Sequence, residues 1–483
     1  MQTTRRTLLK SAAAVVTSGA VSLRFARAAT PPTPVILKLG NYMAEAAGRA
    51  LPEEVIEKTK HHILDTLAAM VSGTELPPGK VAQAMAKAHT GEKTATIVGT
   101  NILCGPIEAA MINGMLAHSD ETDDSHAPSQ SHPGCSIVPA TLAASEQFGT
   151  DGTRMLRAVA LGYDIGTRVT MTLGALDYQM TSHRSSHSIA GNFGSAAAAG
   201  CVAGLNPQQM RWVLDYASQQ AAGIAAWQRD TDHIEKSLVF AGWPARNGVS
   251  AALLIQIGGT GVDDIMAGSD NFLLAFNPKS DPQGLIDKLG ERYEVARTNI
   301  KKWTVGSPIQ APLDALEAMR KKHPFEADQV QKVVVRMATS DANTVNNREM
   351  PDISLQHMVS VMLLDKTASF AAAHDKPRMQ DAAVLRQRAK VDLKADVELD
   401  KLHPARVSIV EVTLADGTKL SERVEAVRGT AENPMTREEV ITKARELTTP
   451  LLGTDKSAKL IQKILALDSV KDVRELRPLL QRG

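Results

Sequence analysis

The sequence carries no marked excess of either charge. Its 483 residues include 54 Lys and Arg against 53 Asp and Glu, which gives a formal net charge of +1. A protein that follows a phosphate backbone normally shows a large basic excess. We therefore expect no nucleic-acid partner.

Cysteine is also scarce. Cys104, Cys135 and Cys201 are too few and too far apart for a disulfide framework, a Cys-x-x-Cys metal site or an iron–sulfur cluster. No Gly-x-Gly-x-x-Gly motif follows a strand and no Gly-Lys-Ser/Thr loop occurs, so the nucleotide-binding folds have no support. Any chemistry must therefore proceed without a thiolate-held cluster.

The overall composition is that of a globular chain with a large core. Hydrophobic residues make up 43% and charged residues 22%. These values differ from those of disordered chains and of membrane-embedded chains. A chain of this length is expected to form two to four domains.

The N-terminus has the order of features of a twin-arginine export signal. Residues 4–10 read TRRTLLK, residues 11–23 are uncharged, and Ala26, Arg27 and Ala28 form a small-x-small cleavage site. The apolar run is shorter than the roughly 18 to 20 residues that a membrane span needs. We expect residues 1–28 to be a signal peptide, the mature protein to be periplasmic, and no stable membrane anchoring to remain after cleavage. The alternative is a basic disordered tail.

The hydrophobic pattern predicts a mainly α-helical protein with a smaller α+β domain. Residues 51–73 have the spacing of an amphipathic helix, with Pro52 in the first turn and Gly73 at the end. Five further segments are rich in alanine and glycine and are expected to be helices that pack closely in a large bundle. These segments are residues 109–118, 155–173, 195–205, 208–227 and 246–258.

The pattern changes after about residue 293. Residues 331–337 are β-branched, and residues 404–426 read as two strands around a turn at Asp416 and Gly417. Residues 354–374 look helical, and residues 375–401 look charge-rich and solvated. Thr436 and Glu439 form a capping box that starts further helices. We predict a helical domain over residues 29–293 and 429–483, interrupted by an α+β lid domain over residues 294–428.

Histidines gather in one segment. Residues 118–132 read HSDETDDSHAPSQSH, with three histidines, four acids and no lysine or arginine. Such a stretch can supply a general acid, a general base or metal ligands. It can equally be a solvated loop with acidic caps.

Two further features could bind an anion. His183, Arg184 and His187 lie in HRSSHSIAGNF, ahead of a small-residue helix whose N-terminal N–H groups would suit a negative charge, although Ser185 or Ser186 can simply cap that helix. Lys236 and Lys301 lie in apolar or aromatic surroundings. A desolvated lysine can neutralise a carboxylate or an enolate-like intermediate, but a lone lysine is usually a surface residue.

The order of these segments resembles the MmgE/PrpD family, whose members include 2-methylcitrate dehydratase, cis-aconitate decarboxylase and iminodisuccinate epimerase. The resemblance runs from about residue 37 to 452. It rests on LPEEVIEKTKHHILDTLAAMVSG, AAMINGMLAHSDETDDSHAPSQSHPGCSIVPA, the histidine-rich segment before FGSAAAAG, KSLVFAGWPARNG, IKKW and NPMTREEV. It implies a helical domain with an α+β lid, an active site in the cleft between them, a homodimer, and no metal or other cofactor.

The resemblance also assigns site residues. The family's acid, hydroxyl and His-Pro histidine fall on Glu121, Ser125 and His132, where Asp and often Thr are usual in the first two places. A family histidine aligns by strict counting with Ser185, and of the flanking His183 and His187 we prefer His187. The lysines match Lys236 and Lys301. His357 takes the place of a lid tyrosine found in some members.

These assignments predict a lyase that acts on a small polycarboxylate by moving a proton next to a carboxylate. His132 and His187 would move protons, and Glu121 and Ser125 would orient a histidine or a substrate hydroxyl. The expected carboxylate-binding residues are Lys236, Lys301 and Arg184, with His183 and His357 also at the substrate.

A hydro-lyase of the 2-methylcitrate dehydratase type is the favoured reaction, and an isomerase or epimerase is the alternative. Two further alternatives are a periplasmic carboxylate-binding protein without activity and a metallohydrolase. The metallohydrolase would use residues of the acidic segment, namely His118, Asp120, Asp123, His126 and His132. We expect Lys301→Ala to abolish turnover and leave the fold intact.

Overall fold

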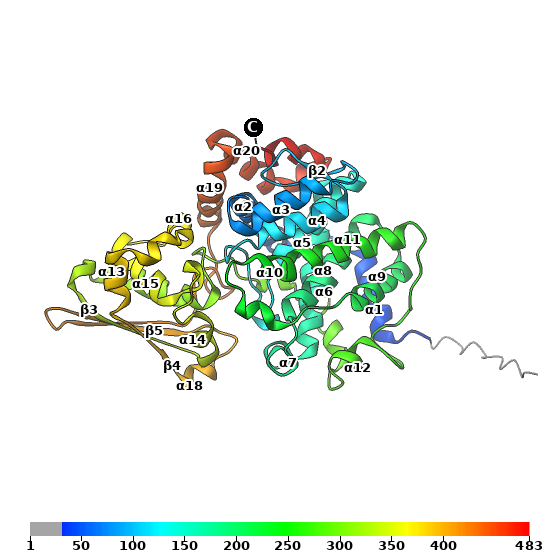
Figure 1. The fold of residues 1–483 in the computed structure, drawn as a ribbon. Coiled ribbons are helices and arrows are strands. Elements are labelled where there is room, and N and C mark those ends of the chain that lie inside the picture. The colour runs from blue at the N-terminus through cyan, green and yellow to red at the C-terminus, as the bar shows by residue number, and fades with distance from the viewer. Residues whose placement is uncertain (1–30, 483) are drawn as a thin grey trace, which may run out of the picture.

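Two hydrophobic cores divide the chain. The computed structural model describes residues 31–482, so the expected signal peptide lies outside the described residues. The first core draws on residues from Val35 to Ile300 and again from Met435 onwards, and the second on residues from Trp303 to Val412. The chain thus leaves a helical body once, forms a smaller domain and returns (Figure 1). This confirms the predicted fold class.

The helical body is a bundle closed by the C-terminal helices. Its helices before the lid are α1 (Pro34–Glu45), α2 (Glu53–Gly73), α3 (Pro77–Ala88), α4 (Pro106–Ala117), α5 (Gly134–Phe148), α6 (Gly152–Leu173), α7 (Ala175–Ser182), α8 (Ser186–Ala203), α9 (Pro207–Gln219), α10 (Ile234–Ser237), α11 (Trp243–Gln256) and α12 (Phe272–Phe276). After the lid come α19 (Arg437–Leu452), α20 (Thr454–Leu465) and α21 (Arg477–Leu480). A two-stranded sheet joins β1 (Ala95–Thr96) and β2 (Leu103–Cys104).

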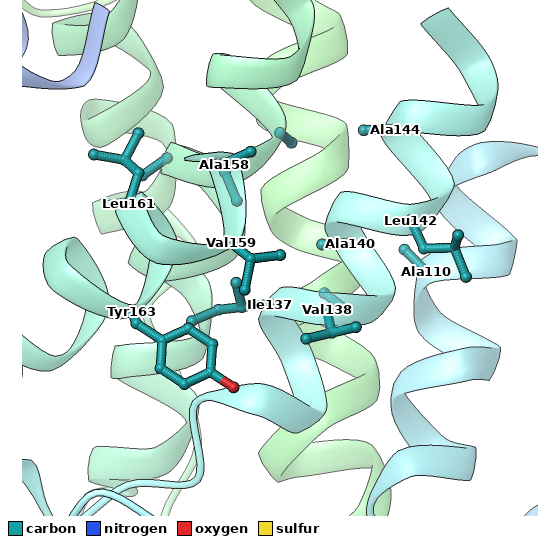
Figure 2. Close-up of a cluster of buried hydrophobic side chains, with 14 of the residues drawn as sticks. Ala110, Ile137, Val138, Ala140, Leu142, Ala144, Ala158, Val159, Leu161 and Tyr163 are labelled. Carbon is teal, nitrogen blue, oxygen red and sulfur yellow. The ribbon is translucent and has the colours of Figure 1, made fainter. Parts of the chain in front are cut away.

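Small residues let the central helices approach closely, as the sequence predicts. A Cβ atom at Gly166 of α6 would lie 2.2 Å from the carbonyl oxygen of Ala190 in α8. Figure 2 shows the neighbouring contact, where Ile137 of α5 and Val159 of α6 point toward each other between alanine positions. Tyr163 extends from the same face of α6, and its hydroxyl donates a hydrogen bond to the Asp124 carboxylate. The core therefore reaches the acidic segment directly.

Helix α2 is more enclosed than an amphipathic surface helix. It begins at Glu53 after Pro52 and ends at Gly73, as predicted, but its residues from Thr59 onwards are buried on all sides. Helix α19 packs along it, and the ammonium of Lys443 lies 2.7 Å from the buried Asp65 carboxylate. The capping box of Thr436 and Glu439 that starts α19 is confirmed.

The lid is a four-stranded sheet with helices on one face (Figure 1). Its strands are β3 (Val330–Met337), β4 (Val391–Ala395), β5 (Ser408–Leu414) and β6 (Lys419–Val424), in the order β4-β3-β5-β6, with β3 and β4 parallel and the other neighbours antiparallel. Its helices are α13 (Ser307–Lys322), α14 (Thr339–Val345), α15 (Leu355–Asp365), α16 (Phe370–His374), α17 (Ala382–Arg388) and α18 (Val397–Asp400). Side chains of α13 and α15 pack on Val333, Val335, Val410 and Val412 to form the second core.

Two predicted segments differ in the structure. Residues 375–401 are not simply solvated, because they include α17 and the strand β4, which pairs in parallel with β3. The charges of that segment lie at exposed or half-buried positions, and the charge-rich composition hides a short strand, Val391–Ala395. Helix α8 starts at Ser186 rather than at residue 195, because Ser185 caps it by accepting a hydrogen bond from the Ser188 N–H.

Within the described residues, one helical run is long and apolar enough to cross a membrane by length and composition alone. This run, Ile234–Gln256, has 67% of its apolar window buried inside the protein. It packs against α4 and α8, so it serves as a core helix of the body.

Candidate active site

The acidic segment that follows α4 is buried. The side chains of Asp120, Glu121, Asp123 and Asp124 are each less than 5% exposed. The solvated-loop alternative is therefore wrong. Buried carboxylates need compensating charges or hydrogen-bond donors, and the structure supplies them from several distant elements.

Asp124 anchors the segment to the body. It accepts hydrogen bonds from the Tyr163 hydroxyl and the Gly134 N–H, and the Nδ1 atom of His62 lies 2.8 Å away. A Cβ atom at position 134 would lie 2.7 Å from the same carboxylate, so glycine is needed there. Asp124 thus joins α2, α5 and α6 below the site and holds its neighbours in place.

Asp123 links two histidines. Its carboxylate lies 3.0 Å from His118 Nδ1 and 3.2 Å from His132 Nδ1. Burial alone would raise the pKa of Asp123, but His118, His132 and Lys301 hold it well below its usual range. A carboxylate on Nδ1 orients the imidazole of His132, whose side chain is 10% exposed.

Glu121 joins the two predicted lysines. Its carboxylate contacts the Lys236 ammonium, and its other oxygen lies 3.3 Å from Lys301 Nζ. Lys301 also donates to the Glu121 backbone carbonyl at 2.8 Å and lies 3.6 Å from Asp123. Burial alone would raise the pKa of Glu121, but Lys236 and Lys301 hold it well below its usual range. Glu121 is therefore an anion that both ammonium groups stabilise.

An aromatic wall faces these charges. A π-helical turn, Leu238–Gly242, joins α10 to α11 and presents Phe240. His187 stacks on Phe240 with 3.9 Å between ring centroids, and His118 stacks on it at 4.8 Å. Trp227 meets both Phe240 and His187 edge-on. Burial, together with His132 and Lys236, holds the pKa of His187 well below its usual range, so His187 is a neutral imidazole at neutral pH.

The turn that carries this wall is packed tightly against α4. A Cβ atom at Gly114 would lie 2.8 Å from the Ala241 backbone, and one at Gly242 would lie 2.9 Å from Met115. This close approach brings His118, at the end of α4, onto the face of Phe240. Unusual helical turns of this kind are frequent at functional sites.

The lid contributes the opposite wall. His374 of α16 lies with Nε2 2.8 Å from the Asp120 carboxylate, while its Nδ1 is 2.7 Å from the Phe370 carbonyl. Asp352 lies 3.9 Å from Nε2 of His233, which is itself 3.4 Å from Glu121. Burial alone would lower the pKa of His374, but the contact with the Asp120 carboxylate raises that pKa to about 9. A buried ion pair therefore joins the lid to the acidic segment.

The structure brings five predicted residues together: Glu121, His132, His187, Lys236 and Lys301. Ser125 lies at the edge of this group, where its backbone pairs with Asn299.

The remaining three predicted residues lie elsewhere in the described structure. His183 is exposed at the end of α7, and the Arg184 guanidinium lies over the Phe276 ring. His357 is buried inside the lid, where burial, followed by the charges of Arg388 and Arg378, lowers its pKa to about 4.

Two groups of side chains have the spacing of metal ligands. They are His118 with Asp123 and Cys135, and His118 with Glu121 and His233. In the second group, Glu121 already carries two ammonium partners, which would repel a divalent cation. In the first, burial raises the pKa of the Cys135 thiol well above its ordinary value.

Sequence reasoning missed several members of the site. Phe240 and Trp227 form its apolar wall, and His233, Asp352 and His374 form its polar wall. His233 could have been noticed because it lies three residues before Lys236 in TDHIEK. Its backbone has a positive φ of 65°, which is uncommon outside glycine and typical of functional turns. Asp352 and His374 have no local signal, since their partners are more than 100 residues away.

Comparisons with known proteins agree with this architecture. A cis-aconitate decarboxylase-like protein of Aspergillus oryzae is 24% identical over 93% of this chain and 98% of its own length. Cis-aconitate decarboxylase of Aspergillus terreus is 24% identical over 92% of this chain and 96% of its own length. Cis-aconitate decarboxylase of Homo sapiens is 27% identical over 89% of this chain and 91% of its own length. Family models match too: the MmgE/PrpD N-terminal domain covers residues 37–284 and the MmgE/PrpD C-terminal domain covers residues 303–469. The chain therefore belongs to the MmgE/PrpD family.

Proposed function

We propose that this protein is a lyase that acts on a small polycarboxylate, and that its reaction is the loss of CO2 with proton transfer to carbon. The observation that carries the proposal is the arrangement around His132. Asp123 orients the His132 imidazole, whose ring centroid lies 5.1 Å from that of His187 and 5.9 Å from that of Phe240, and the Lys236 ammonium lies against the same Phe240 ring.

Lys236 is the cation that can hold the substrate. Its side chain is 11% exposed, and Glu121 is its one carboxylate partner in the described structure. The ammonium also lies 5.2 Å from the Phe240 ring centroid and 5.5 Å from that of Trp227. Lys301 is only 2% exposed and is occupied by Glu121 and Asp123. Lys236 therefore contacts a substrate carboxylate, while Lys301 stabilises the two buried acids.

The apolar wall supports decarboxylation. When a carbon–carboxylate bond breaks, its electron pair moves into the remaining unsaturated carbon skeleton, CO2 leaves, and a proton must reach carbon to complete the product. A carboxylate held against Phe240 and Trp227 is poorly solvated, which favours the neutral CO2 that replaces it. His132 donates the proton, and Lys236 stabilises the negative charge that develops on a remaining carboxylate. The names of the similar proteins support this reaction over others.

A hydro-lyase, the reaction favoured from the sequence, is the second candidate. It needs one group to remove a proton from carbon and another to protonate the departing hydroxyl. His233 favours it, because this buried imidazole has no hydrogen-bond partner on either ring nitrogen within the described residues and lies beside Glu121. His132 and His233 could then act as base and acid. The same pair would also permit epimerisation.

The test is a screen of the mature protein against small saturated, unsaturated and hydroxylated di- and tricarboxylic acids, read by mass spectrometry. Decarboxylation gives a product lighter by CO2, and dehydration gives a product lighter by water with new absorbance at about 240 nm. Epimerisation exchanges the α-proton without a change in mass in ordinary water. His132→Asn and Lys236→Met are the inactive controls. Binding of acids without turnover of any would contradict the proposal and favour the carboxylate-binding alternative.

We also propose that the enzyme is exported by the twin-arginine route and works as a homodimer. The support is the order of features in residues 1–28 and the family resemblance. Fractionation of cells expressing the full chain, with Arg5 and Arg6 both changed to Lys as the control, tests export. Light scattering after size-exclusion chromatography tests the assembly.

A further inference from the structure

A cavity lies at the junction of the two domains. It has a volume of about 320 Å³, within the range of small-molecule sites. Its walls come from Ser125, from Arg297 to Lys301 on the chain entering the lid, from Leu402 to Arg406 in the lid, and from the chain leaving it. His132, His187 and Lys236 do not line it. It is therefore separate from the proton-transfer centre and meets it through Ser125 and Lys301.

The cavity lies at the hinge, which we define as residues 297–302 and 426–432, where the chain crosses between the domains. The two crossings are hydrogen-bonded to each other, since the Ile300 N–H donates to the Gly429 carbonyl at 3.0 Å. Asn299 pairs with Ser125 of the acidic segment in both directions. A change in the angle between the lid and the body would strain these hydrogen bonds. A ligand bound in the cavity beside them would therefore restrain that motion.

Two arginines face the cavity from opposite domains. Arg297, on the body side, donates to Glu294 through Nη1 at 2.8 Å, and Arg406, on the lid side, contacts Asp341 through Nη1. Among the described residues neither guanidinium has a second carboxylate partner. Each therefore keeps further N–H donors for a ligand, and a guanidinium can bind a carboxylate through two parallel hydrogen bonds.

The other charged side chains of the wall are two paired cations and two exposed carboxylates. Arg428 is occupied by Glu439 and Asn433, and Lys301 by the buried acids. Glu425 and Glu432 lie at the rim and are exposed, and Glu425 is paired with Arg423.

One polar atom in the wall has no partner. Ser307, at the first position of the 16-residue helix α13, lines the cavity, and its buried Oγ has no hydrogen-bond partner in the described structure. The first turn of a helix also has N–H groups without helical acceptors, which favours an anion there. The remaining wall includes the apolar side chains of Leu402, Pro404 and Val427. This combination fits a short carbon chain with a carboxylate at each end.

We propose that the hinge cavity binds a small dicarboxylate between Arg297 and Arg406 and that this ligand holds the lid against the body. The cavity borders the catalytic site at Ser125 and Lys301, and the proposal does not depend on which reaction the enzyme performs. A ligand bound there would reach the active site through Ser125 and Lys301.

The test is calorimetric titration with succinate, a non-reactive dicarboxylate probe, combined with hydrogen exchange of the hinge. Lys236→Met removes the catalytic carboxylate contact, so this variant should retain hinge binding and gain protection in both hinge segments. Adding Arg297→Gln or Arg406→Gln to it should weaken that binding at least tenfold. Arg445→Gln, a change at an exposed arginine that neither lines the cavity nor pairs with a residue of its wall, is the matched control and should have no effect.

Arg406→Lys is the control for a folding defect. It keeps a cation beside the buried Asp341 and loses only the planar guanidinium with its paired N–H donors. It should fold normally and still weaken binding. The proposal is overturned if succinate binding is unchanged in the Arg297 and Arg406 variants, or if Lys236→Met removes all binding. Neither result would bear on the proposed lyase activity, which is measured by turnover and not by binding of this probe.

Discussion

At the scale of single residues, the site is a balance of buried charges. Glu121 and Asp123 are stabilised as anions by Lys236, Lys301, His118 and His132, and none of these groups could be buried singly at low cost. The two lysines differ in their exposure and in the number of their carboxylate partners. Lys236 is partly open to a ligand, whereas Lys301 is enclosed between two carboxylates.

Lys236→Met is expected to lower kcat/KM by roughly 100-fold or more, because the substrate loses its cation while Glu121 retains Lys301. The thermal midpoint should also fall, because the buried Glu121 loses the nearer of its two ammonium partners. Steady-state kinetics on the substrate found by the screen measure the first effect. Lys80→Met, which removes an exposed lysine paired with Glu75, is the matched control and should retain full activity.

Lys301→Ala is expected to destabilise the fold by roughly 3 to 5 kcal/mol, because it leaves Glu121 and Asp123 buried with less compensation. This differs from the expectation from sequence alone, in which the fold stays intact, and the cause is the 2% exposure of the Lys301 side chain. Denaturant unfolding of the variant measures the change. An unchanged free energy of unfolding would show that Lys301 is not needed to hold these acids.

The local parts of the site were predictable from the sequence, and the distant ones were not. His132, Lys236 and Lys301 carry motifs of their own, and the acidic segment was identified by its composition. His374 is an ordinary histidine in its local sequence. It acquires its position because α16 packs beside Asp120, 254 residues earlier in the chain. Pairings of this kind follow from the fold and not from spacing.

At the scale of elements, close helix contacts place the site. Gly166→Ala is expected to cost roughly 1 to 3 kcal/mol, because the new Cβ would lie 2.2 Å from the Ala190 carbonyl oxygen and force α6 away from α8. Since α8 carries His187, activity should fall together with the thermal midpoint. Gly48→Ala is the matched control, because its Cβ would meet nothing closer than 3.8 Å. Equal midpoints for the two variants would contradict this packing.

The ion pair between α16 and the acidic segment predicts a pH dependence. Its three facing groups are the Asp120 carboxylate, the Asp352 carboxylate and the Phe370 carbonyl. The pKa of His374 is raised to about 9 in the folded protein, above its ordinary value of about 6.5 when unfolded. The stabilisation is therefore complete below about pH 6.5 and is lost as the pH rises through about 9.

His374→Gln is accordingly expected to lower the free energy of unfolding by roughly 1 to 3 kcal/mol near neutral pH and by little above about pH 10. Unfolding of wild type and variant across this range measures the difference. His323→Gln, an exposed lid histidine, is the control. A difference that stays constant with pH would show that His374 is not charged in the pair.

The elements themselves were predicted unevenly. The turn at Asp416 and Gly417 and the capping box at Thr436 are local signals, and both are confirmed. Strand β4 was missed because it is only five residues long and charged, and it becomes a strand by pairing with β3. Tertiary pairing therefore decided what local composition could not.

At the scale of the whole molecule, two cores joined by a paired hinge create the site between them. The helical body supplies His132, His187 and the lysines, and the lid supplies Asp352 and His374. The family resemblance predicts a mainly helical protein with a smaller α+β domain, which is confirmed, whereas the catalytic cleft that it implies stays a prediction. The hinge cavity had no counterpart in the sequence, because its walls come from segments that are more than 270 residues apart, such as Ser125 and Ala405.

The central claim is that His132 delivers a proton to carbon as CO2 leaves. The most direct measurement is mass spectrometry of the product formed in D2O from the acid that the enzyme consumes. We expect a product that has lost CO2 and gained one non-exchangeable deuterium per turnover, and we expect His132→Asn to form it at least roughly 100-fold more slowly. A product that retains every carbon, or a His132→Asn variant with undiminished turnover, would contradict the account.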